Sequence, residues 1–181
     1  MTNSKAGADP RQHIITLSIL IAVALIDQLS KIWAVGHLTE GATRSVMGNF
    51  FKLTLLYNEG GALGSQLGSG TFYLITSLII IVVIFFFIYT NRHNAFIAWP
   101  MALCAGGAAG NLIDRIRTGR VVDFLDFDFF DISLGSFHLE RWWKFNVADA
   151  AITVGVLFLL VYILFMPRVH PDKTAAVSEP E

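Results

Sequence analysis

Two aspartates, Asp123 and Asp149, have the residue type and the setting for acid–base chemistry. Asp123 comes shortly after one long apolar stretch of the chain, and Asp149 lies at the start of the next. A short reversal of the chain between these stretches would bring both carboxyl groups to one pocket. Two like charges in a site of low dielectric cannot both ionise easily, so such a pair shares one proton and its two pKa values move apart.

A carboxylate beside a carboxylic acid predicts hydrolysis of a peptide bond. The carboxylate acts as a base and deprotonates a water molecule, which attacks the peptide carbonyl. The acid protonates the carbonyl oxygen and later the leaving amine. This is the chemistry of aspartyl proteases.

Other catalytic schemes find few of the residues they need in this sequence. The single cysteine, Cys104, lies in an apolar stretch without an evident activating partner, and we interpret it as a small packing residue. No G-x-S-x-G motif stands at a strand-to-helix turn. The five histidines are scattered, and no H-E-x-x-H motif or cysteine pair gives the spacing of metal ligands. We therefore expect no metal site and no cofactor.

The elements that would position the aspartates are membrane spans. Hydrophobic residues make up 54% of the 181 residues, and charged residues only 15%. Four apolar segments, 14–35, 71–89, 96–114 and 147–166, are long enough to cross a bilayer, which needs about 20 residues. We expect one four-helix membrane domain over 14–166 between polar tails at 1–13 and 167–181. The net charge of −1 offers no basic face for nucleic acid.

The first apolar segment also has features of a cleavable signal peptide. Lys5 and Arg11 precede it, and Ala22-Val23-Ala24 imitates a cleavage site. The apolar run continues past Ala24 to Val35, which favours a retained span.

Polar residues of several spans converge at one leaflet. Four spans place both termini on one side of the membrane and the long connections 36–70 and 115–146 on the other. The direction of each span then brings five polar residues to the side of these connections: Asp27, Lys31, Asn111, Asp114 and Asp149. Asp27 and Lys31 are spaced i, i+4 on one helix face, which predicts an ion pair that supports the structure.

The long connections have the alternation of short strands. Residues 122–132 roughly alternate apolar and acidic types, and residues 49–57 are mostly apolar and aromatic. Together with Trp142 and Trp143 they predict a small sheet at the membrane interface. We expect Asp126, Asp128 and Asp131 to lie on a solvated strand face.

The order and spacing of four motifs resemble bacterial lipoprotein signal peptidase, also called signal peptidase II. The motifs are Asp27-Gln28-Leu29-Ser30-Lys31, then Asn58-Glu59-Gly60-Gly61-Ala62-Leu63-Gly64, then Gly106 to Arg115 continuing through Val122-Asp123-Phe124, and finally Phe145-Asn146-Val147-Ala148-Asp149. Gly61 and Leu63 depart from the usual Ala and Phe of the second motif, which removes no catalytic group.

The resemblance implies an aspartyl endopeptidase with four transmembrane helices and a small β-sheet at the non-cytoplasmic interface. Its implied substrate is a diacylglyceryl-modified prolipoprotein, cut on the amino side of the lipidated cysteine. Membrane lipid is a second implied partner, and no nucleic acid is expected. No oligomer is implied. The implied catalytic pair falls on Asp123 and Asp149, and the substrate-binding or site-supporting positions fall on Asn58, Gly60, Asn111, Arg115, Asn146, Asp27, Lys31 and Asp114.

Two alternatives concern function and orientation. Carboxylates at membrane depth also serve proton or ion relays, but here the acids cluster at one leaflet and the spans show no internal repeat. A purely structural four-helix protein would not explain the polar residues in its spans.

The resemblance implies an inner-membrane protein with cytoplasmic termini and a periplasmic or outer active site. Counting Lys and Arg gives five on the termini side and seven on the other, and this count alone predicts the reverse orientation.

Overall fold

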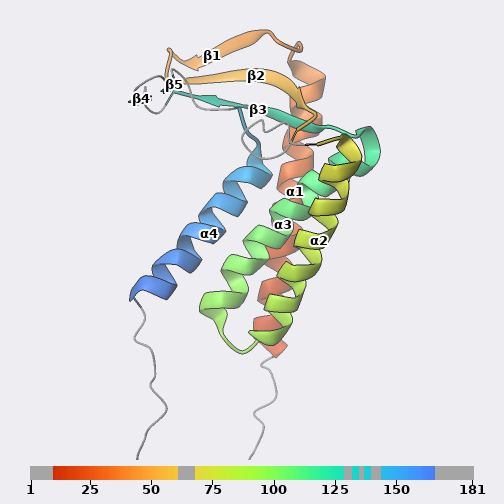
Figure 1. Cartoon of the computed structure of the whole chain (residues 1–181), viewed down its shortest axis with the longest axis vertical. Helices are drawn as coiled ribbons and strands as arrows, with labels where there is room; N and C mark the ends of the chain where they lie inside the picture. Colours follow the sequence, from red (N-terminus) through yellow and green to blue (C-terminus); the bar gives the residue numbers. More distant parts are fainter. Residues whose placement is uncertain (1–9, 61–67, 129–131, 135–136, 140–143, 166–181) are drawn as a thin grey trace, which may run out of the picture.

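The computed structural model describes residues 10–60, 68–128, 132–134, 137–139 and 144–165. Its helices are α1 (Pro10–His37), α2 (Gly70–Thr90), α3 (Ala95–Thr118) and α4 (Val147–Phe165). Its strands are β1 (Thr43–Met47), β2 (Phe51–Asn58), β3 (Val121–Phe127), β4 (Ile132–Leu134) and β5 (Phe137–Leu139). The helices form a bundle, and the sheet of β1, β2 and β3 lies across one end of it (Figure 1).

All four predicted spans are helices that are long and apolar enough to cross a membrane. The predicted fold class, four transmembrane helices with a small sheet, is therefore confirmed. The outer helix faces are apolar: Val82 on α2 and Ile163 on α4, for example, are 65% and 67% exposed. Such apolar faces suit contact with lipid chains. The backbone needs no water there, because its N–H and C=O groups are hydrogen-bonded within the helix.

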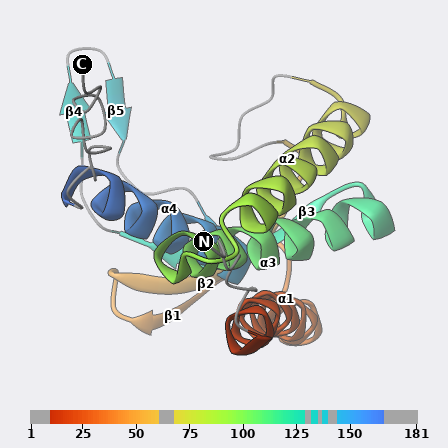
Figure 2. The ribbon, with the colours of Figure 1, turned by 90° about the horizontal axis from the view of Figure 1, so that it is seen from below.

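Helix α3 lies at the centre of the bundle and contacts α1, α2 and α4 (Figure 2). Glycines allow this close packing. A methyl group added at Gly106 would lie 2.6 Å from the carbonyl oxygen of Leu20 on α1. One added at Gly155 of α4 would lie 2.6 Å from the carbonyl oxygen of Pro100 on α3. The backbone of α3 therefore packs directly against its neighbours, as small residues permit in membrane helices.

Strand β2 lies between β1 and β3, and both pairings are antiparallel. The sequence predicted β2 and β3 but not β1, whose five residues are all exposed and show no apolar alternation. In the register of β2 with β3, Leu56 is opposite Asp123 and Asn58 is opposite Val121. Asn58 is thus a diagonal neighbour of Asp123, within reach of its side chain.

The expectation of a solvated acidic face on β3 is wrong for Asp126. Its side chain is buried and accepts a hydrogen bond from Oγ1 of Thr54 (2.8 Å). Apolar–acidic alternation predicts one covered face, whereas β3 is covered on both, with Val122 and Phe124 on one face and Val121 and Asp123 on the other. Asp128 is half-buried. Asp131, Trp142 and Trp143 lie outside the described residues, as do residues 61–64 of the second motif.

Candidate active site

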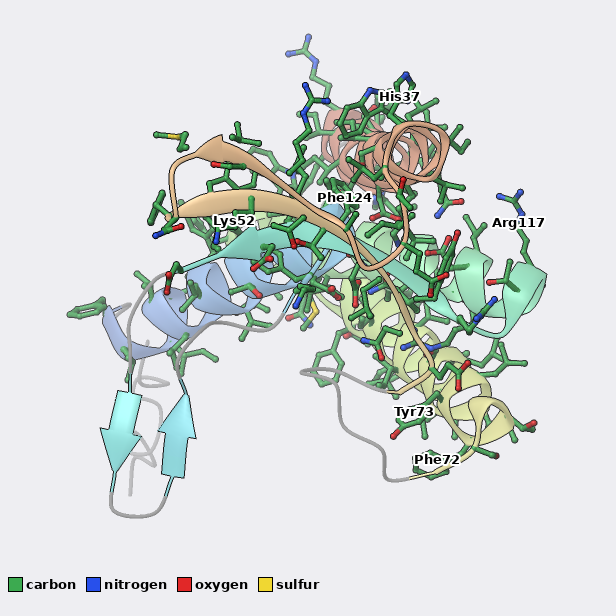
Figure 3. All side chains as sticks on the ribbon, turned by 90° about the horizontal axis from the view of Figure 1, so that it is seen from above. His37, Lys52, Phe72, Tyr73, Arg117 and Phe124 are labelled. Carbon is green, nitrogen blue, oxygen red and sulfur yellow. The ribbon has the colours of Figure 1, made fainter. Side chains whose placement is uncertain are left out.

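The elements that carry the predicted site residues meet where the sheet crosses the end of the bundle (Figure 3). Strand β3 carries Asp123 and β2 ends at Asn58. The first turn of α4 carries Asp149, and Asn146 directly precedes this helix. The final turns of α1 and α3 bring the remaining polar residues: Asp27, Lys31, Asn111, Asp114 and Arg115. Segments far apart in the sequence thus supply one polar cluster.

Asn146 links the two aspartates. Its side chain is fully buried, and Nδ2 donates to Oδ1 of Asp123 (2.7 Å). Its backbone N–H donates to Oδ2 of Asp149 (3.3 Å), and the backbone N–H of Asp149 donates to Oδ1 of Asn146 (2.9 Å). This reciprocal pair is a capping box that begins α4. The residue that starts the helix therefore also binds both carboxyl groups.

Two further amides complete the donors around the aspartates. Nδ2 of Asn58 donates to Oδ2 of Asp123 (3.0 Å), while its own Oδ1 accepts from the backbone N–H of Gly60 (2.9 Å). Nδ2 of Asn111 donates to Oδ1 of Asp149 (2.8 Å). Every oxygen of the two carboxyl groups thus accepts at least one N–H, which fixes the orientation of both groups.

The predicted Asp27–Lys31 ion pair forms and extends to α3. Nζ of Lys31, which is 2% exposed, lies 2.9 Å from Oδ2 of Asp27 and 2.9 Å from Oδ2 of Asp114. It also donates to Oδ1 of Asn111 (2.8 Å). An ammonium group has three donors, so the buried charge is fully hydrogen-bonded. The cluster connects directly to the amide that binds Asp149.

Sequence reasoning did not identify Gln28 as a site-supporting residue. Its Nε2 donates to Oδ1 of Asp114 (2.9 Å) and to the carbonyl oxygen of Gly110 (3.0 Å), and so ties α1 to α3. Asp27 ties α1 to α4, because its Oδ1 accepts from the backbone N–H of Ala148 (2.9 Å). The only signal for Gln28 was its place between Asp27 and Lys31 in the first motif.

Arg115 connects the cluster to the segment that follows β2. Its Nη2 donates to the carbonyl oxygen of Gly60 (3.3 Å), which brings the two predicted residues together. Among the described residues, no group of three His, Cys, Asp or Glu side chains is placed to hold a metal ion.

The surroundings of Asp123 make it a weak acid near neutral pH. Burial, and to a smaller extent the negative charge of Asp149, raise the pKa of its carboxyl group to about 7, against the opposing effect of the amides of Asn58 and Asn146. Asp123 is 1% exposed, which accounts for the size of the burial effect. A carboxyl group that is protonated near pH 7 can donate a proton to a substrate.

Comparison with solved structures gives the class of protein. Two structures described as bacterial membrane enzymes match this chain with TM-scores of 0.72 and 0.70. The first is 32% identical and matches 82% of this chain and 87% of its own, and the second is 31% identical and matches 84% and 94%. The chain is therefore a multi-pass membrane enzyme.

Sequence comparison gives the family. A family model described as "Signal peptidase (SPase) II" matches residues 19–165. Lipoprotein signal peptidases of Chlorobium phaeovibrioides and Clostridioides difficile are each 37% identical to this chain, over 87% and 82% of it and over 93% and 95% of their own lengths. The relative in Cupriavidus taiwanensis is 37% identical over 93% of this chain and 92% of its own.

The chain belongs to the signal peptidase II family, the membrane aspartyl proteases that cleave signal peptides from prolipoproteins. It is a multi-pass protein of the bacterial inner membrane. The family resemblance found in its motifs is thereby confirmed.

Proposed function

We propose that Asp123 and Asp149 are the catalytic pair of this peptidase. The observation that carries the proposal is that a single buried residue, Asn146, binds both carboxyl groups at the end of the bundle. One carboxyl group with a pKa of about 7 beside a second carboxyl group supplies an acid and a base together. Water attacks the scissile carbonyl with help from the base, and the acid protonates the carbonyl oxygen.

The other predicted site residues then have supporting roles. Asn58, Asn111 and Asn146 orient the catalytic carboxyl groups through their amide N–H donors. Asp27, Lys31 and Asp114 form the charged cluster beneath them. Arg115 and Gly60 join α3 to the segment after β2, which places a cation and a chain turn beside the pair.

The proposed substrate is a prolipoprotein whose cysteine already carries diacylglycerol, cut on the amino side of that cysteine. The exposed apolar helix faces next to the site can receive acyl chains from the side. Each buried methylene contributes about 0.8 kcal/mol, so two chains supply ample binding energy to place the scissile bond. Binding energy from a remote group can be converted into rate when it orients the reacting bond.

The proposed orientation has cytoplasmic termini and an active site toward the periplasmic or outer face. The start of α1 and the end of α4 lie at the end of the bundle opposite the sheet (Figure 1). A protein with the site on the outer side would meet its substrate where exported prolipoproteins emerge. The count of Lys and Arg predicts the reverse, so the orientation requires its own test.

Purified protein in detergent should cleave a lipobox peptide that carries diacylglyceryl-cysteine and should release the segment before that cysteine. The same peptide without lipid should be cut at least about a hundredfold more slowly, because it lacks the remote binding energy of the acyl chains. Equal cleavage of the two peptides would contradict the lipidated substrate and leave the aspartyl mechanism standing. Absence of cleavage of either peptide by folded protein would contradict the proposed function.

A further inference from the structure

The two carboxyl groups of the proposed catalytic pair have unlike surroundings. Asp149 lies in the first turn of α4, where the backbone N–H groups that point out of the helix end and the helix dipole favour negative charge. One of its oxygens accepts the backbone N–H of Asn146. Asp123 lies on a strand, which offers no comparable dipole, and its donors are two neutral side-chain amides. The local structure therefore favours a negative charge on Asp149 over one on Asp123.

A cation acts on Asp149 through one intervening amide. Nζ of Lys31 can only donate, so the amide oxygen of Asn111 faces it at 2.8 Å. The amide nitrogen of Asn111 must then face Asp149, to which it donates at 2.8 Å. The oxygen of Asn111 also accepts from Nδ2 of Asn146 (3.1 Å), which fixes the same orientation. A cation on the oxygen of an amide strengthens donation from its N–H, because hydrogen bonds in series polarise one another.

The other charged groups near Asp149 are accounted for as well. Among the described residues they come from three elements: Asp27 and Lys31 on α1, Asp114 and Arg115 on α3, and Asp123 on β3. The negative charges of Asp27 and Asp114 are both within 2.9 Å of Lys31, and Asp27 also accepts from the backbone of α4. The guanidinium of Arg115 lies near enough to both aspartates of the pair to interact with them electrostatically.

We propose that in the resting enzyme Asp149 is the ionised base and Asp123 the protonated acid, and that Lys31 is a positioning residue that sets this order through Asn111. The inference rests on the proposed function of the two aspartates. Water gives a proton to Asp149 as its oxygen bonds to the peptide carbonyl carbon, and Asp123 gives its proton to the carbonyl oxygen. The C–N bond then breaks as Asp149 protonates the amine nitrogen and Asp123 takes a proton from one hydroxyl of the intermediate, which restores both starting states.

Infrared spectroscopy of purified protein without substrate tests the proton assignment directly. At pH 5, the C=O band of a protonated carboxyl group should disappear in Asp123→Asn and persist in Asp149→Asn. The reverse pattern overturns the proposal. Because this experiment needs no substrate, a reversed pattern together with inactive variants leaves the catalytic pair intact, whereas wild-type cleavage by both variants contradicts the proposed function itself.

The pH dependence of kcat/KM tests the role of Lys31. The double variant Lys31→Gln with Asp114→Asn removes the cation and one carboxylate together, so the charge of the cluster is preserved. The acidic limb of the profile, which reports ionisation of the base, should move up by about one pH unit, and the basic limb should stay in place.

Gln28→Met is the matched control, because it removes hydrogen bonds to Asp27, Asp114 and Gly110, and none of these bonds involves Asn111. It should lower thermal stability and leave both limbs where they are. If the double variant keeps both limbs in place, or moves the basic limb instead, Lys31 does not position Asp149 as proposed. If the double variant does not fold, the infrared comparison still decides the proton assignment.

Discussion

Replacing the buried acid Asp123 by asparagine should make the protein more stable than the wild type at pH 8. At pH 5 the variant and the wild type should be about equally stable. The pKa of Asp123 is raised from 3.8 to about 7 in the folded state, mainly by burial. The unfolded chain therefore releases this proton at lower pH than the folded protein does. The free energy of unfolding falls as pH rises between these two values, and the loss is complete above the folded pKa.

The magnitude follows from the shift. About three pKa units at about 1.4 kcal/mol each give a penalty of about 4 kcal/mol at pH 8, and less than half of that at pH 5. Asparagine removes the penalty, but its side chain has one oxygen and cannot accept from both Asn58 and Asn146 as the carboxyl group does. One of these two buried hydrogen bonds is therefore lost, at a cost of about 1–2 kcal/mol. The net stabilisation should be about 2–3 kcal/mol at pH 8 and close to zero at pH 5.

Thermal unfolding in detergent, followed by tryptophan fluorescence, measures the effect as a change in Tm at the two pH values. Asp128→Asn is the control, because it makes the same chemical change at a half-buried position just after β3. Its Tm difference from the wild type should be small and equal at both pH values. A Tm of Asp123→Asn that lies below the wild type by the same amount at pH 5 and pH 8 would refute the reasoning.

Three further predictions concern packing, topology and metal ions. Gly110→Ala should lower the Tm because its methyl group would overlap a buried carboxylate of α1, whereas Gly36→Ala, with nothing within 4 Å, should not. In a Cys104→Ala background, cysteine at exposed Ser45 should react with an impermeant thiol reagent from the outer face of cells, and cysteine at exposed His93 should not; the opposite labelling would reverse the proposed orientation. Prolonged treatment with a strong chelator should leave the cleavage rate unchanged, and loss of activity that zinc restores would contradict a metal-free aspartyl mechanism.

The helices could be predicted from sequence because each contains an apolar run of membrane-spanning length. The ends of α2 and α4 lie within about one residue of the predicted bounds, whereas polar residues continue α1 and α3 beyond their apolar runs. The third span was predicted over 96–114, but α3 continues to Thr118 and ends where Gly119 adopts a positive φ of 74°. That end is set by a local backbone conformation, not by hydropathy.

Interactions between residues close in sequence could be predicted, whereas those between residues far apart in sequence could not. The Asp27–Lys31 pair follows from helical spacing alone. The partners of Gln28 on α3 do not, because contacts between helices depend on how each helix is rotated in the bundle. The buried state of Asp126 depends likewise on both faces of β3 being covered, which the alternation of one strand does not reveal.

The double role of Asn146 was also beyond sequence reasoning. Its motif placed it near Asp149, but its bond to Asp123 requires that β3 lie beside the segment that leads into α4. The backbone bonds between Phe145 and Leu125 hold these segments together. The motif therefore indicates that Asn146 lies near Asp149, but only the fold shows that it also binds Asp123.

The central claim, that Asp123 and Asp149 together cleave the substrate, is tested most directly by the cleavage rate of each single variant on the diacylglyceryl peptide. Asp123→Asn and Asp149→Asn should each lose at least about 10²- to 10⁴-fold in kcat, because each removes one partner of the proton transfer. A Tm measured on the same samples shows that the variants are folded. We expect two folded and inactive proteins, and a folded variant that retains about a tenth of the wild-type rate would remove that aspartate from the mechanism.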